Sequence, residues 1–96
     1  MSVPIVEEQD VRTLLPMPEC IALMRQAMIR VSSGGTKMPL RQIMAIPEGS
    51  NRLGAMMGYL DEARSLGIKV VGLFEGNPNR GLPSHIGMVL VMDPEP

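Results

Sequence analysis

Lys69 stands where a cation is uncommon, inside the apolar run "GIKVVGLF" that spans residues 67–74. The run is typical of a strand, and its period-two alternation puts Lys69 on one face with Val71 and Leu73. If that face is buried, the ammonium must find an anion or lose its proton, because desolvation disfavours the charged form. Lys69 is therefore a candidate for holding a carboxylate or transferring a proton. The alternative is an edge-strand lysine whose stem covers apolar surface while its head reaches water.

Two more side chains could take part in the same chemistry. Arg41 follows Pro39 in "KMPLRQ", at the start of a neighbouring candidate strand, where its guanidinium could hold a carboxylate at two points. The alternative for Arg41 is a solvated surface cation. His85 follows "GLPS" and is the only histidine, which excludes a multi-histidine metal site. It could act as an acid or base, although a lone loop histidine is usually neither, and we predict no metal site.

The sequence lacks the short motifs that are typical of a cofactor site or a catalytic nucleophile. No GxGxxG, GxxxxGK[ST], GxSxG or HExxH occurs in it. We therefore expect no nucleotide-binding loop within these 96 residues.

The first third of the chain predicts two helices. One runs from Glu7 to Leu15 and stops at Pro16, and the second begins near Pro18 and ends at "SSGG" over residues 32–35. The second helix carries an apolar stripe at spacings of three and four residues, which predicts a surface helix covering a core. A partner-binding helix is the alternative, and the stripe consists of Ile21, Met24, Met28 and Val31.

The remainder of the chain has the texture of short strands separated by turns. Short links between consecutive strands favour antiparallel pairing, and "LDEARSL" over residues 60–66 could form a helical turn. We predict a single α+β domain over residues 1–96, with the N-terminal helices packed on a mostly antiparallel sheet of four to five strands. The last strand is nearly all apolar, so we expect both of its faces to be covered. The predicted strands are 40–46, 53–59, 67–74 and 86–92, with a short opening strand at 3–6.

Composition and charge exclude several classes of protein. Hydrophobic residues make up 45% of the chain and charged residues 20%, as in a soluble globular protein. The net charge of −1 and the absence of a basic stripe argue against a nucleic-acid partner. The N-terminus has no basic segment, and no apolar run approaches the roughly 20 residues that span a bilayer, so we expect no membrane association. Cys20 is the only cysteine, which favours a cytoplasmic setting and a buried, structural thiol.

Four segments in a fixed order resemble the N-terminal part of the ornithine cyclodeaminase and mu-crystallin family. They are "VRTLLPMPECIALMRQAM", "MPLR", "GIKVVGLFEGNPNRGLPSHIG" and "VLVMDPE". The resemblance covers about residues 6–95, and its most specific part is "GIKVV" followed by "GNPNRGLPS".

This resemblance implies NAD(P)-dependent enzymes or binding proteins that act on amino, imino or keto acids. Such proteins combine an N-terminal substrate and dimerisation domain with a separate Rossmann domain. The resemblance implies that Arg41 and Lys69 contact the substrate carboxylate, that Lys69 is the catalytic candidate near the reacting carbon, and that Ser84 lies near the nicotinamide. Glu75 stands where the family often has proline, and this acid could pair with Arg80 or alter the charge of the pocket.

The cofactor domain that follows the "DPE" segment in this family is not in the sequence, and hydride transfer needs a bound cofactor. We expect no cofactor on this chain alone, and NAD(H) or NADP(H) only where a Rossmann domain is supplied. The leading hypothesis is a truncated domain that forms a homodimer or higher oligomer through its sheet and keeps a remnant amino or keto acid site. One alternative is the N-terminal part of an NAD(P)-dependent cyclodeaminase or amino or imino acid dehydrogenase whose cofactor domain is absent or separately encoded. Another is a non-catalytic small-molecule binding module.

Overall fold

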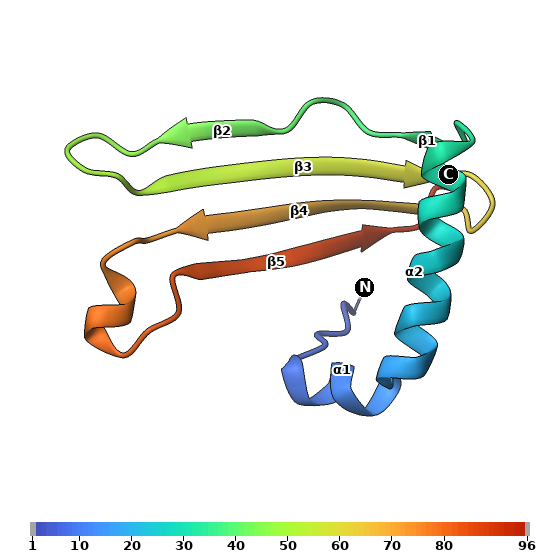
Figure 1. Cartoon of the computed structure of the whole chain (residues 1–96), viewed down its shortest axis with the longest axis horizontal. Coiled ribbons are helices and arrows are strands. Elements are labelled where there is room, and N and C mark those ends of the chain that lie inside the picture. Colours follow the sequence, from blue (N-terminus) through green and yellow to red (C-terminus); the bar gives the residue numbers. More distant parts are fainter. Residues whose placement is uncertain (1, 96) are drawn as a thin grey trace.

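Two helices pack on an antiparallel sheet of five strands in the computed structural model, which describes residues 2–95 (Figure 1). The predicted α+β architecture is therefore confirmed, and these residues contain no Rossmann domain. No helix among them is long and apolar enough to cross a membrane. The elements are α1 (Glu8–Leu14), α2 (Met17–Ser32), β1 (Thr36–Lys37), β2 (Gln42–Ala45), β3 (Arg52–Leu60), β4 (Ser65–Leu73), the 3-10 helix η1 (Asn77–Arg80) and β5 (His85–Met92).

Strand β3 organises the sheet. It pairs with β4 along its whole length on one side, and on the other side with β1 near its end and β2 near its start. β5 pairs with β4 and forms the far edge. All pairings are antiparallel, as the short links predict.

Several predicted elements differ from those observed, and β2 begins at Gln42 where a start at residue 40 was predicted. β1 was not predicted, because two residues are too short to show an alternating pattern. β4 begins at Ser65, two residues early, and the preceding residues 61–64 form a turn in which Arg64 has a φ of 49°. The loop after β4 contains η1, which ends at Gly81 with a left-handed φ of 74°. The predicted strand at residues 3–6 does not form, and Pro4 there has no N–H to give to a ladder.

Local signals define both helix starts. The Asp10 carboxylate accepts a hydrogen bond of 2.9 Å from the Glu7 backbone N–H, which satisfies one of the free donors at the start of α1. Pro16 precedes α2, and Pro18 occupies its first turn, where a missing N–H removes no helical hydrogen bond. α2 ends before Gly34, whose left-handed φ of 86° is the conformation predicted for the cap.

A charged clamp fastens α2 to the turn between β3 and β4. The Arg30 guanidinium donates to both carboxylate oxygens of Asp61, at 2.9 and 2.7 Å, and its Nε lies 3.4 Å from Glu62. The hydrogen bond from Arg30 lowers the pKa of Asp61, and the Asp61 carboxylate raises the pKa of Arg30. The clamp fixes the end of α2 over the end of the sheet, where Figure 1 shows the helix crossing the strands.

The apolar stripe of α2 does not meet the sheet as predicted. Ile21, Met24 and Met28 are 54%, 53% and 62% exposed. The residues that face the sheet are Ala27 and Val31, which line a pocket together with β3 and β4. The prediction was wrong for three of its four residues, because helical periodicity locates an apolar arc but not the part of the arc that contacts another element.

The sheet has two unlike faces. The helix face is glycine-rich. One pocket on this face is also lined by Ala27 and Val31 of α2, and a second pocket is also lined by Val6 and by Val11 of α1. Pairing register assigns to the helix face Gly54, Met56, Gly58, Gly67, Lys69, Val71, Gly87 and Val89. The opposite side, the open face, carries Leu53, Ala55, Met57, Tyr59, Leu66, Ile68, Val70, Ile86, Met88, Leu90 and Met92.

No hydrophobic side chain is buried among residues 2–95. The chain exposes 8342 Å², whereas a compact monomer of this mass exposes about 5,400 Å². Its radius of gyration is 15.9 Å, against about 12.5 Å for a compact domain of this length. The predicted cover over residues 86–92 is absent within the single chain, since all eight residues of β5 are exposed. Within residues 2–95 of the single chain, the fold therefore forms no hydrophobic core.

Candidate functional site

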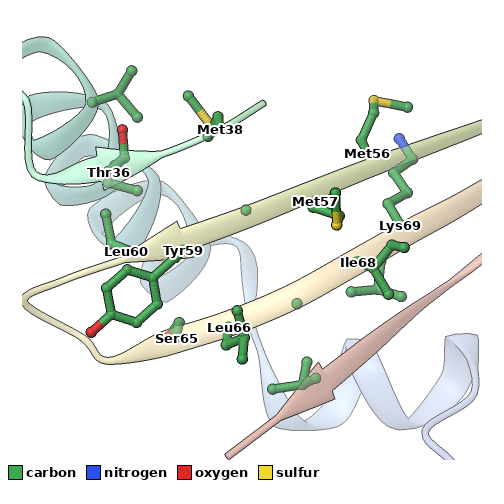
Figure 2. Close-up of a pocket in the computed structure, with 16 residues that line it drawn as sticks. Thr36, Met38, Met56, Met57, Tyr59, Leu60, Ser65, Leu66, Ile68 and Lys69 are labelled. Atoms are coloured by element: carbon green, nitrogen blue, oxygen red, sulfur yellow. The ribbon is translucent and has the colours of Figure 1, made fainter. Parts of the chain in front are cut away.

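Lys69 lies at the centre of β4, on the helix face. Its direct neighbours across the ladders are Met56 of β3 and Val89 of β5. Figure 2 shows the Lys69 amine beside the side chain of Met56 on the adjacent strand. The predicted placement of Lys69 among apolar neighbours is correct, but its side chain is exposed in the single chain.

Three glycines lie near Lys69 on the helix face, so few side chains stand beside it. Gly67 precedes Lys69 by two residues on the same face, and Gly58 lies directly opposite Gly67 in β3. On the other side of Lys69, Gly87 lies opposite Val71. The lysine stem therefore rises from backbone that carries few side chains, and the amine is reachable by a small molecule.

Two pockets meet at Lys69. One, of about 450 Å³, lies between α2 and the sheet, and its lining is mostly apolar, with Lys69, Thr36, Tyr59 and Ser65 as its polar residues (Figure 2). The other, of about 530 Å³, lies between the N-terminal segment and strands β4 and β5, and it includes His85. A charged group beside apolar space suits a ligand that has one anionic end and one carbon-rich end.

Arg41 lies outside the paired strands, one residue before β2. The β2 register, continued by one residue, would set Arg41 opposite Met56 on the helix face, whereas the β1 register, continued over residues 38–41, would set it opposite Ala55 on the open face. The two registers differ by one residue, so the strand pairing itself does not bring Arg41 to Lys69. Within residues 2–95, neither cation forms an ion pair.

Ser84 is not beside Lys69. It precedes β5 and is five residues from Val89, the neighbour of Lys69, which corresponds to about 17 Å along the strand. Its backbone carbonyl accepts a hydrogen bond of 2.8 Å from the Phe74 N–H, and its hydroxyl lies 2.9 Å from Nδ1 of His85. Ser84 therefore lies just before β5, away from Lys69. Its predicted role near a nicotinamide applies to that part of the sheet.

His85 is the residue that sequence reasoning undervalued. It lines the second pocket together with Lys69. The β4–β5 register places both side chains on the helix face. Counting by twos from His85 along β5 reaches Val89, the neighbour of Lys69, but only the pairing of β4 with β5 reveals this. Glu75, in contrast, pairs with Arg52 at 3.5 Å and not with Arg80. No three His, Cys, Asp or Glu side chains of residues 2–95 group as metal ligands.

The fold and these residues define a class of protein: a two-layer α+β module with one apolar open face and one cationic, glycine-floored helix face. A sequence profile of the ornithine cyclodeaminase/mu-crystallin family matches residues 2–96. The chain belongs to this family, and the resemblance drawn from its motifs is confirmed.

Individual relatives agree with this assignment. A Delta(1)-pyrroline-2-carboxylate/Delta(1)-piperideine-2-carboxylate reductase of Azospirillum brasilense is 30% identical over 92 residues, covering 95% of this chain and 28% of that protein. The ketimine reductase mu-crystallin of Rattus norvegicus is 34% identical over 61 residues, covering 64% of this chain and 20% of that protein. The chain thus spans between a fifth and a third of the length of these relatives.

Two solved structures share the fold. The Thermococcus litoralis Delta(1)-pyrroline-2-carboxylate reductase in complex with NADH and L-proline superposes with a TM-score of 0.87 at 31% identity, over 94% of this chain and 28% of that one. An archaeal alanine dehydrogenase dimer with bound NAD superposes with a TM-score of 0.86 at 26% identity, over 99% of this chain and 28% of that one.

Proposed function

We propose that this chain is the carboxylate-binding and oligomerisation module of a family whose members are NAD(P)-dependent reductases or cyclodeaminases. The observation that carries the proposal is Lys69, a cation at the centre of the helix face between Met56 and Val89. The β2 register, continued by one residue, would bring Arg41 to the other side of Met56, and neither cation is paired with a carboxylate within residues 2–95. A ligand carboxylate bridging them would accept charge-assisted hydrogen bonds from both.

The roles of the two cations differ in this proposal. Arg41 presents a planar pair of donors that matches a carboxylate and fixes its orientation. Lys69 presents a single ammonium over the glycine floor, where it holds the same carboxylate and stands near the adjacent carbon. An α-amino, α-imino or α-keto acid fits this arrangement because its reactive carbon is bonded to the carboxylate carbon.

The open face supports the oligomerisation part of the proposal. Met57, Met88 and Met92 on this face are 57%, 63% and 56% exposed, and apolar patches of this kind mark interaction surfaces. The chain exposes roughly 2,900 Å² more than a compact monomer would, and a standard interface needs only about 800 Å² from each partner. A second copy of the chain placed open face to open face would bury the residues that now lack a core.

Catalysis by the family chemistry belongs to the proposal only when a cofactor domain is present. The relative from Thermococcus litoralis is described with NADH and L-proline, and the archaeal alanine dehydrogenase is described as a dimer with NAD. By analogy, NAD(H) or NADP(H) would supply or accept the hydride next to Lys69. We place the protein in the cytoplasm on its lone cysteine.

A second function has a specific observation in its favour. The helix face around Lys69 is open on the side away from α2, so a separately encoded cofactor domain could complete the site there. In that case the chain is the N-terminal part of an NAD(P)-dependent cyclodeaminase or an amino or imino acid dehydrogenase. If no such domain joins it, the same cations make a non-catalytic module that binds small acids.

Calorimetric titration with a panel of amino and keto acids tests the carboxylate site. We expect wild-type protein to bind at least one acid, Lys69→Ala to weaken that binding at least about tenfold, and Lys37→Ala to leave it unchanged. Lys37 is a suitable control because it lies in β1 on the opposite face. Absence of binding by the wild-type protein, or equal binding by Lys69→Ala, would remove the proposal.

Mixing experiments separate the catalytic function from the binding one. A purified Rossmann domain from a family relative is added to this chain, and NAD(P)H oxidation is followed with a cyclic imino acid. Turnover that requires both proteins and is lost in Lys69→Ala supports the enzymatic function. Carboxylate binding without any turnover supports the binding module.

A further inference from the structure

We propose that the pocket between α2 and the sheet binds an unbranched alkyl monocarboxylate, with its carboxylate on Lys69 and its chain running toward α2. This inference rests on the proposed carboxylate site and names the kind of acid that the chain holds by itself. The preferred ligand has a long apolar chain and no amino group. The pocket, of about 450 Å³, is named the α2 groove below.

The α2 groove follows the β3–β4 ladder from Lys69 to the end of the sheet that α2 covers. Lys69 lies four residues from Ser65 along β4, which makes the groove about 14 Å long. Gly58 and Gly67 lie between these two positions and leave the floor without side chains. Figure 2 shows this course, with the Lys69 amine at one end of the two strands and Leu60 and Ser65 at the other.

The walls of the α2 groove are aliphatic and thioether side chains. Val89 and Val91 of β5 line one side, Met38 lies on the β1 side, and Ala27 and Val31 of α2 line the far end. A methionine side chain adapts its shape to what lies beside it. Each methylene that a ligand buries against such walls favours binding by about fourfold. The groove therefore rewards the length of an alkyl chain.

Charge in the α2 groove favours a carboxylate and disfavours an ammonium group. Among the described residues that line the groove, Lys69 is the only charged one, and the described lining of the second pocket, beside His85, contains no acid. The other polar residues are distant from Lys69 or on the other face: Thr36 and Ser65 lie at the α2 end, and Tyr59 belongs to the open face. An ammonium group on the ligand would lie near Lys69 without an anion to pair with, which is unfavourable.

Calorimetry on the wild-type protein with butyrate, hexanoate, octanoate, 2-aminooctanoate and octanol, all below micelle formation, tests the inference. We expect the affinity to rise about tenfold from butyrate to hexanoate and about tenfold again to octanoate. 2-Aminooctanoate, which adds an ammonium group, should bind at least about tenfold more weakly than octanoate. Octanol, which lacks the charge, should also bind at least about tenfold more weakly.

Variants at the two ends of the groove locate the ligand. Lys69→Met keeps an apolar stem and removes the charge, so it should weaken both butyrate and octanoate at least about tenfold. Ala27→Leu fills the α2 end, so it should weaken octanoate at least about tenfold and change butyrate less than about twofold. Ala22→Leu is the matched control, because Ala22 is exposed on the same helix and does not line the groove. It should leave both affinities unchanged.

The outcomes separate this inference from the proposed function. Equal affinity for butyrate and octanoate, 2-aminooctanoate or octanol binding as tightly as octanoate, or octanoate binding that Ala27→Leu or Lys69→Met leaves unchanged would overturn the alkyl chain in the groove. The carboxylate site would still stand if butyrate binding is lost in Lys69→Met. Failure of every acid to bind, or butyrate and octanoate both unaffected by Lys69→Met, would overturn both. The wild-type series needs no variant, so it decides the matter even if Ala27→Leu does not fold.

Discussion

Lys69 and Met56 face each other directly across the β3–β4 ladder, in the middle of the helix face. In the proposed site Arg41 lies on the far side of Met56, so a bound carboxylate would lie over Met56. We predict that Met56→Glu supplies that carboxylate from the protein itself. The new cross-strand pair with Lys69 should stabilise the fold by up to about 1 kcal/mol, which thermal or denaturant unfolding would measure.

The same variant should stop binding of external acids, because its carboxylate occupies the cations. Met56→Gln is the control, since it removes the thioether without adding charge and should keep most of the binding. If Met56→Glu bound acids as well as the wild-type protein does, acids would not bind over Met56 between Lys69 and Arg41.

The clamp between Arg30 and Asp61 should make stability depend on pH in acid. The Arg30 hydrogen bond lowers the pKa of Asp61 in the folded chain, so the unfolded chain takes up the proton first as the pH falls. The stabilisation is therefore complete above the unfolded value of about 3.9 and is lost as the pH falls through the folded value. Denaturant unfolding at several pH values would measure it.

Asp61→Asn should remove this acid-dependent part of the stability curve, and Glu8→Gln should not, because Glu8 pairs only with Arg12 on an exposed helix surface. A carboxyl NMR titration of Asp61 gives an independent check. An Asp61 pKa at or above its ordinary value would show that the clamp does not form in solution.

Charge on the open face should break the oligomer. Met57→Lys puts an ammonium among apolar side chains that a second copy would cover, and burying an unpaired charge is strongly unfavourable. We expect the dissociation constant of the dimer to rise at least about 100-fold, as measured by sedimentation or light scattering across a concentration series.

Met24→Lys is the matched control for this experiment. Met24 is 53% exposed, close to the 57% of Met57, but it lies on α2 away from the sheet. It should leave the oligomeric state unchanged. A wild-type protein that is monomeric at micromolar concentration, or a dimer that tolerates Met57→Lys, would contradict an interface on the open face.

Glycine at position 67 should be needed for strand packing, unlike glycine at 58. A Cβ at Gly67 would crowd the Leu90 carbonyl oxygen, so Gly67→Ala should destabilise the chain by about 1 to 3 kcal/mol. Gly58→Ala should change stability by less than about 1 kcal/mol in either direction. Comparing the denaturant midpoints of the two variants checks this, and similar losses would mean that both glycines serve packing alone.

Much of the fold could be predicted from local signals. Pro16, Pro18 and the glycines after Ser33 bound α2 as they were predicted to, and apolar runs separated by turn residues located β2, β3, β4 and β5. The alternation of β4 also placed Lys69 correctly among its apolar neighbours. These features depend on residues close together in the sequence, which is why the sequence reveals them.

Features that depend on distant residues were less accessible. The sequence did not predict β1, since two residues carry no period, and it misassigned the sheet-facing side of α2. The expected cover over β5 is absent within one chain, because an apolar strand shows that it needs a partner but not where the partner comes from. His85 joins the Lys69 pocket only through the pairing of β4 with β5, which no local pattern encodes.

The central claim is that an acid binds on the helix face at Lys69, and an amide NMR titration with L-proline tests it most directly. We predict shift changes centred on Gly58, Gly67 and Val89 in the wild-type protein, and their loss in Lys69→Ala, with the rest of the spectrum preserved. Changes that persist unaltered in Lys69→Ala, or that cluster on the open face instead, would contradict it.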